Sequence, residues 1–222
     1  PKSRFYSILE FMHRDSEIFY NNIAQTSPYP LGITIEKAEG VYLYSPDGKE
    51  FIDLISGIGV NNIGHRHPRV INAIKDQLDK HLHVMVYGEY IQKPAVELAK
   101  LLARNLPYPL ENTYLVNSGT EAIEGALKLA KRSTGRSEII AAHNAYHGNT
   151  MGSMSVMGFE ERKRAFRPLL PDVKFITFNN EEDLTQITTK TAGVILETIQ
   201  GGAGFIQPEN GYLEKVRERC NE

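Results

Sequence analysis

Short apolar runs alternate with amphipathic stretches over the second half of the chain. Apolar, β-branched runs predict strands at residues 113–116, 138–142, 174–178 and 193–196. A helix over residues 121–132 is predicted by the spacing of five apolar residues: Ala122, Ile123, Ala126, Leu127 and Ala130. Another helix is predicted over residues 215–220. Strands that are apolar almost throughout need cover on both faces, so the pattern predicts an α/β fold with a mainly parallel sheet covered by helices.

The first half of the chain has a different pattern. Residues 41–44 and 51–54 read as two strands around the turn Ser45-Pro46-Asp47-Gly48, which predicts a hairpin. Pro68 and Pro94 each open a predicted helix, because proline is tolerated in the first helical turn. The helix at Pro68 places four apolar residues on one face: Ile71, Ile74, Leu78 and Leu82. A small N-terminal segment is therefore expected ahead of the α/β part.

Composition and charge narrow the class of protein. Hydrophobic residues make up 41% of the 222 residues and charged residues 23%, which is enough for a folded core. The 25 Lys+Arg and 27 Asp+Glu give a formal net charge of -2, with no sign of a nucleic-acid partner. The basic residues Arg162, Lys163, Arg164 and Arg167 read as a solvated face. No apolar run approaches the roughly 20 residues of a membrane helix. The single cysteine, Cys220, suits a reducing compartment, so we expect a cytoplasmic protein.

The junction between the strand at 113–116 and the following helix is the first candidate site. Ser118, Gly119 and Thr120 stand where a parallel strand ends and a helix begins, which is where α/β proteins bind ligands. Backbone N–H groups at a helix N-terminus and two hydroxyls suit a phosphate group. The same residues also fit an ordinary helix N-cap followed by an acid, and the spacing alone leaves both interpretations open.

Two further loops follow predicted strands. In the first, Tyr146 and His147 offer an aromatic face and an imidazole, either as a platform for a planar ring or as a plain turn with a half-buried tyrosine. His143 and His147 have metal-ligand spacing only if they are helical, which Gly148 disfavours, so no metal site is expected. In the second loop, Glu197 precedes a glycine-rich stretch and could orient a polar ligand or simply be solvated.

In their order along the chain, these segments resemble the class III (subgroup II) aminotransferases, which are pyridoxal-phosphate enzymes of fold type I. The resemblance covers essentially the whole chain. It rests on these motifs: Gly40-Val41-Tyr42, Asp47-Gly48, Phe51-Ile52-Asp53, Gly57-Ile58-Gly59-Val60-Asn61, Gly64-His65-Arg66-His67-Pro68, Asn117-Ser118-Gly119-Thr120-Glu121-Ala122, Tyr146-His147-Gly148 and Glu197-Thr198-Ile199-Gln200-Gly201. It implies an incomplete large domain at residues 55–222, preceded by residues 1–54 as part of the small domain.

The resemblance also implies a role for each matching residue. Ser118, Gly119 and Thr120 would hold the phosphate of pyridoxal 5′-phosphate. Tyr146 would stack on its pyridine ring with His147 beside it, and Glu197 would be the active-site glutamate of the family. The expected partners are a small-molecule amine, a 2-oxo acid and a second copy of the enzyme in a homodimer.

The chain departs from the family pattern in three ways. Members are about twice as long, and the acid that pairs with the pyridine nitrogen and the Schiff-base lysine are both expected beyond Glu222, so no catalytic residue is expected within this chain. Asn149 stands where members acting on acetylornithine, ornithine or 4-aminobutyrate commonly have an arginine that grips a substrate carboxylate. Thr198 replaces the usual proline of its loop.

The sequence thus predicts the amino-terminal part of an aminotransferase that is inactive alone. The alternative is a non-catalytic binding module, or one half of a protein completed by a second polypeptide.

Overall fold

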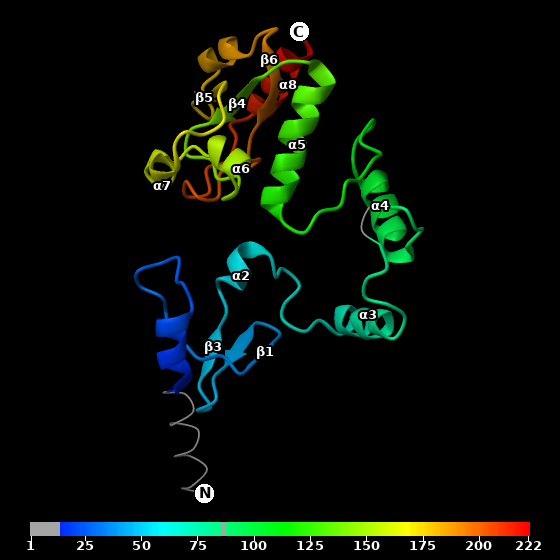
Figure 1. Cartoon of the computed structure of the whole chain (residues 1–222), viewed down its shortest axis with the longest axis vertical. Helices are drawn as coiled ribbons and strands as arrows, with labels where there is room; N and C mark the ends of the chain where they lie inside the picture. Colours follow the sequence, from blue (N-terminus) through cyan, green and yellow to red (C-terminus); the bar gives the residue numbers. More distant parts are fainter. Residues whose placement is uncertain (1–13, 86–87) are drawn as a thin grey trace, which may run out of the picture. The chain divides into compact units, whose positions relative to one another are not determined.

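The computed structural model describes residues 14–85 and 88–222 and divides into two compact units, Pro1–Ile91 and Gln92–Glu222 (Figure 1). The domain boundary expected between residues 54 and 55 stays a prediction. In the part of the chain that the structure describes, no helix has the length and hydropathy needed to cross a bilayer.

The first unit contains the predicted hairpin within a three-stranded antiparallel sheet. Its strands are β1 (Lys37–Glu39), β2 (Tyr42–Tyr44) and β3 (Glu50–Ile52), in the order β1-β2-β3. Strand β1 was not predicted, because its three residues Lys-Ala-Glu carry no apolar pattern and only pairing with β2 defines it. Two helices follow, α2 (Ser56–Gly59) and α3 (Pro68–Leu78), and α3 begins at the predicted proline.

The side chain of Asp53 stabilises the loop that follows β3 through hydrogen bonds. Its carboxylate accepts hydrogen bonds from the backbone N–H of Ser56 at 2.8 Å and of Ile55 at 3.1 Å, and it pairs with His65 Nε2 at 2.7 Å. The bond from Ser56 and then the bond from His65 lower the pKa of Asp53. The side-chain nitrogen of Asn61 lies 2.8 Å from Nδ1, the other ring nitrogen of His65. Both ring nitrogens of this histidine therefore have a hydrogen-bond partner.

The second unit is an α/β arrangement with a parallel three-stranded sheet, as predicted. Strand β4 (Glu138–Ala142) lies in the centre and pairs in parallel with β5 (Val173–Ile176) and with β6 (Thr191–Ile195). The helical elements are α4 (Lys93–Asn105), α5 (Gly119–Thr134), α6 (Met151–Ser155), α7 (Glu160–Lys163), η1 (Arg164–Phe166), η2 (Glu182–Gln186) and α8 (Tyr212–Asn221).

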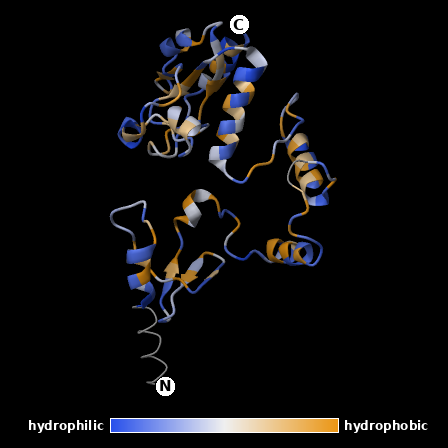
Figure 2. Cartoon of the chain, viewed as in Figure 1, coloured by the Kyte–Doolittle hydropathy of each residue, from blue (hydrophilic) through white to orange (hydrophobic). Residues whose placement is uncertain are grey.

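Helices cover both faces of this sheet, which explains why β4 is buried at every position. Ile139 and Ala141 face one way and pack with Leu127 of α5. Ile140 and Ala142 face the other way and pack with Tyr212 and Val216 of α8. Successive side chains of a strand point to opposite faces, so a strand between two helical layers must be apolar throughout. Polar and apolar residues alternate along α5 (Figure 2), and Ile123, Leu127 and Ala130 of this helix pack against the sheet.

The prediction of a strand at residues 113–116 is wrong. These residues form no strand in the structure, and Tyr114 is 78% exposed. A strand requires a neighbour for its backbone N–H and C=O groups. Within residues 14–85 and 88–222, no strand pairs with this segment.

The prediction of a solvated basic face is wrong for Lys163, which is buried. Its ammonium donates to the carbonyl of Met157 at 2.6 Å and lies 4.0 Å from the centre of the Phe175 ring. A carboxylate oxygen of Glu160 lies 3.8 Å from the same ammonium nitrogen. Burial lowers the pKa of Lys163, and the charge of Glu160 partly offsets that effect. The long apolar stem of lysine allows such burial when the charge finds partners.

Candidate functional site

Helix α5 begins at the predicted Ser-Gly-Thr junction. Ser118 is the N-cap, and its side-chain oxygen accepts from the backbone N–H of Glu121 at 3.3 Å. The carboxylate of Glu121 turns back and accepts from the N–H of Asn117 at 2.7 Å. The N-cap interpretation is therefore confirmed, and it leaves room for a ligand. Among the described residues, no acceptor receives the backbone N–H groups of Gly119 and Thr120.

The hydroxyl of Thr120 is held by the start of α6. Its oxygen lies 2.8 Å from Thr150 Oγ1 and 2.7 Å from Ser153 Oγ. The N–H of Thr150 also donates to it at 3.3 Å. Gly148 passes directly beside this hydroxyl, because a Cβ built on Gly148 would lie 2.4 Å from Thr120 Oγ1. The close approach brings the loop of Tyr146 and His147 to the N-terminus of α5.

That loop presents one exposed ring and one buried ring. Tyr146 is 40% exposed, whereas His147 is 8% exposed. Within the part of the chain that the structure describes, His147 Nε2 has no hydrogen-bond partner. Burial lowers the pKa of His147, and the charge of Glu197 opposes that shift only in part. His147 is therefore neutral at neutral pH.

Glu197 joins the loops that follow β4 and β6. One of its carboxylate oxygens accepts from the backbone N–H of Tyr146 at 2.9 Å, and the other accepts from Gly201 at 3.3 Å. The buried Gln200 adds a second link, since its side-chain amide donates to the carbonyl of His143 at 2.8 Å. Because β4 and β6 are parallel neighbours, their carboxyl ends meet at the same edge of the sheet.

The structure brings the six predicted site residues into one connected region. The Thr120 side chain lies beside Gly148, the residue that follows His147. The backbone N–H of Tyr146 is hydrogen-bonded to the carboxylate of Glu197. Their roles stay predictions. His143 and His147 are not helical, so they do not present metal-ligand spacing. Residues 14–85 and 88–222 contain no group of three or more His, Cys, Asp or Glu side chains placed to hold a metal ion.

Three further residues belong to this region and were not predicted from the sequence: Glu124, Thr150 and Ser153. Glu124 lies one turn into α5 and accepts hydrogen bonds from the start of α6. Thr150 and Ser153 form a capping box, a pattern of two side chains three residues apart that is visible in the sequence. The link from this box to Thr120 spans about 30 residues, so no local pattern reveals it.

The chemistry of these groups fits pyridoxal phosphate. A phosphate is bound well by unpaired N–H groups at a helix N-terminus, where the helix dipole also places positive potential. A Cβ built on Gly119 would meet no atom within 4 Å, so there is open space beside the first residue of α5. Tyr146 supplies an accessible aromatic face on the neighbouring loop. The unpartnered His147 Nε2 is a further polar atom available to a ligand or to other protein groups.

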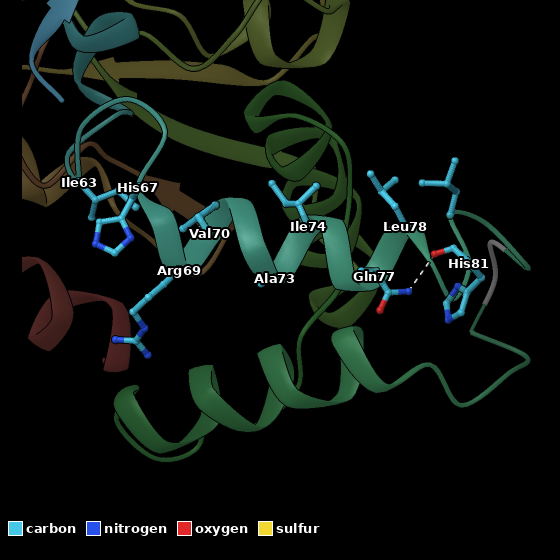
Figure 3. A pocket seen from close by; sticks show the side chains of 10 residues that line it. Ile63, His67, Arg69, Val70, Ala73, Ile74, Gln77, Leu78 and His81 are labelled. Atoms are coloured by element: carbon cyan, nitrogen blue, oxygen red, sulfur yellow. Dashed lines mark hydrogen bonds between the residues drawn. The ribbon is translucent and has the colours of Figure 1, made fainter. Parts of the chain in front are cut away.

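A separate hollow of about 720 Å³ runs along α3 in the first unit (Figure 3). Figure 3 shows that Val70, Ile74 and Leu78 project along one side of this helix. Ile74 and Leu78 belong to the apolar face expected for the helix, whereas Val70 was not predicted there, and each of the three is roughly half exposed. Most of the side chains that line the hollow are apolar, and His67, Arg69 and His81 line it as well.

Comparison with known proteins agrees with the motifs. The family model described as "Aminotransferase class-III" matches residues 23–222. Acetylornithine aminotransferase of Clostridium acetobutylicum is 41% identical over 197 residues, covering 86% of this chain and 50% of that protein. The LysW-aminoadipate semialdehyde/glutamate semialdehyde transaminase of Sulfolobus acidocaldarius is 40% identical over 189 residues, covering 85% and 48%.

A solved structure with the same fold is the taurine:2-oxoglutarate aminotransferase of Bifidobacterium kashiwanohense, in complex with PLP and glutamate. It superposes with a TM-score of 0.80 at 26% identity, covering 94% of this chain and 53% of that chain. The expected fold type I is confirmed. The chain spans about half the length of the relatives it matches.

Proposed function

We propose a function from the premise that this chain belongs to the class III aminotransferases, the family whose model covers residues 23–222. The chain supplies the phosphate cup and the ring-stacking wall of an enzyme that transfers an amino group from a primary amine to a 2-oxo acid. The family uses pyridoxal 5′-phosphate, as the sequence predicted, and the taurine aminotransferase above holds it. The N-terminus of α5 carries the proposal, because its N–H groups are open and its Thr120 hydroxyl lies beside Gly148, at the end of the Tyr146 loop.

Each site residue has a distinct part in this proposal. Ser118, Gly119 and Thr120 bind the phosphate through N–H and hydroxyl groups. Tyr146 lies against the ring, and its loop is kept in place by Glu197. His147 stays neutral and buried beside the ring. When bound, pyridoxal phosphate supplies the electron sink that lets an amino group pass between the two substrates.

Substrates, assembly and location belong to the same proposal. The substrates are a small amine and a 2-oxo acid, and Asn149 at the position of the usual arginine favours an amine whose recognition does not rest on that contact. The intact enzyme is a homodimer in the cytoplasm, as family membership and the single cysteine suggest. Sedimentation of the intact protein tests the dimer, and a monomer at enzyme-assay concentrations would contradict it. The Schiff-base lysine expected beyond Glu222 stays a prediction.

The replacement Thr120→Ala tests the phosphate cup. A hydrogen bond to a charged group contributes about 1.5–3 kcal/mol, so the dissociation constant of pyridoxal phosphate should rise by roughly 10- to 150-fold. Thr134→Ala is the matched control, because Thr134 lies at the opposite end of α5, where its hydroxyl donates to the carbonyl of Ala130 and accepts from the N–H of Arg136. An unchanged dissociation constant for Thr120→Ala would remove the assignment. Cofactor binding by the intact protein without amino transfer would instead favour a binding module.

A further inference from the structure

Glu124 holds the start of α6 against α5. One oxygen of its carboxylate accepts hydrogen bonds from the backbone N–H groups of Gly152 at 2.8 Å and Ser153 at 3.1 Å, and from the hydroxyl of Thr150. Burial disfavours the charge of Glu124, but the bonds from Thr150, Ser153 and Gly152 outweigh burial and lower its pKa. Glu124 is thus an ionised group with three donors aimed at it.

The closeness of this contact depends on a glycine. A Cβ built on Gly152 would lie 2.1 Å from Glu124 Oε2 and 2.7 Å from the carboxyl carbon. Any other residue at this position would push the carboxylate away from α6. The carboxylate and the glycine therefore fit each other as a pair.

Counting protons shows how the contact reaches Thr120. An ionised carboxylate only accepts, so the single hydroxyl proton of Thr150 points to Glu124. Thr150 Oγ1 is then left to accept from Thr120 at 2.8 Å. Ser153 Oγ, fixed by the same helix start, contacts Thr120 Oγ1 at 2.7 Å. The N–H of Thr150 also donates to the Thr120 oxygen at 3.3 Å, so this oxygen keeps its place when its own proton turns from Thr150 toward a ligand.

We propose that Glu124 is a positioning residue for the phosphate cup, acting through Thr150 and Ser153 on the hydroxyl of Thr120. The inference rests on the proposed function, because it assumes that Thr120 faces the cofactor phosphate. The carboxylate of Glu124 bonds to the start of α6 and not to the phosphate cup itself. Its effect is to set the place of a hydroxyl that lies against both the cup and Gly148, at the end of the Tyr146 loop.

The test compares pyridoxal phosphate with pyridoxal, which lacks only the phosphate, on the intact protein. Glu124→Gln removes the charge at nearly constant volume, and Thr150→Val removes the hydroxyl at constant shape. Both replacements should lower the affinity for pyridoxal phosphate about tenfold, as expected for the loss of a charge-assisted hydrogen bond. The affinity for pyridoxal should not change. Thr150→Ser keeps the hydroxyl and should retain wild-type affinity for both compounds. The control Glu214→Gln changes an exposed glutamate on α8 and should alter neither.

The outcomes separate this inference from the function on which it rests. The inference is overturned if Glu124→Gln and Thr150→Val leave both affinities unchanged or lower both by the same factor. In either case the wild-type ratio of the two affinities is kept, and Glu124 has only a structural role. If the wild-type protein itself binds pyridoxal as tightly as pyridoxal phosphate, the phosphate cup is wrong, and the inference fails with it. Melting temperatures identify a variant that does not fold. Thr150→Ser then serves as the folded variant, and a loss of phosphate preference in it would contradict the inference.

Discussion

Gly119→Ala should affect stability and cofactor binding in opposite directions. Gly119 is the first residue of α5 and has a helical backbone, so alanine fits without strain. A Cβ there meets no atom within 4 Å. Replacing glycine by alanine at such a position stabilises a protein by about 0.4–1 kcal/mol, because the unfolded chain loses freedom. The apo protein should therefore melt at the same temperature or a few degrees higher.

The same methyl group should obstruct the phosphate. Cα–Cβ bonds tilt toward the N-terminus of a helix, so the new methyl would project toward the end of α5 where the phosphate is proposed to bind. Forcing an extra methyl into an occupied site costs roughly 1–3 kcal/mol, which corresponds to a rise of about 5- to 150-fold in the dissociation constant.

Two measurements on the intact protein check this prediction: calorimetric melting without cofactor and absorbance titration with pyridoxal phosphate. The matched control is Gly125→Ala on the same helix, where the new Cβ would lie 3.3 Å from the Tyr114 ring and away from Thr120. It should leave the dissociation constant unchanged. If Gly119→Ala binds the cofactor as tightly as wild type, the phosphate does not lie at the N-terminus of α5, and the reasoning is refuted.

Three further predictions concern the loop after β4. Tyr146→Phe should keep cofactor affinity, because stacking needs only the ring, whereas Tyr146→Ala should weaken it by about 0.5–1.5 kcal/mol; a loss seen only in apo melting would contradict the stacking role. Because the folded pKa of His147 is depressed, the folded state resists its protonation. Its contribution to stability should be complete above the unfolded pKa near 6.5 and fall as pH drops from there toward the folded pKa, a dependence that His147→Gln should reduce in melting curves from pH 7 to 5. Gly158→Ala should destabilise the protein by about 1–3 kcal/mol or more in urea unfolding, since its Cβ would lie 2.3 Å from the nitrogen of Asn144 and 2.5 Å from the oxygen of Ala142; an unchanged unfolding midpoint would refute the clash.

Local patterns determined much of the second unit. The strand predicted at residues 138–142 has those bounds in the structure, because a continuous apolar run can be buried only between two helical layers. The helix predicted from residue 121 begins at Gly119, and the serine before it acts as the cap that its side chain favours. The Tyr146 loop and the Glu197 loop were visible in the sequence as segments that follow strands, whereas in the described chain the Ser-Gly-Thr junction begins α5 with no strand directly before it.

Only the tertiary structure decided which of these segments meet. Tyr146 and Glu197 are 51 residues apart and bond because the sheet order β5-β4-β6 places the ends of β4 and β6 side by side. Lys163 looks like a surface lysine until Phe175 and the carbonyl of Met157 are seen around it. Residues 113–116 have the composition of a strand, yet they form none where the described chain has no strand beside them. Periodicity and capping are local properties of a sequence, whereas the pairing of strands and the burial of charge depend on partners distant along the chain.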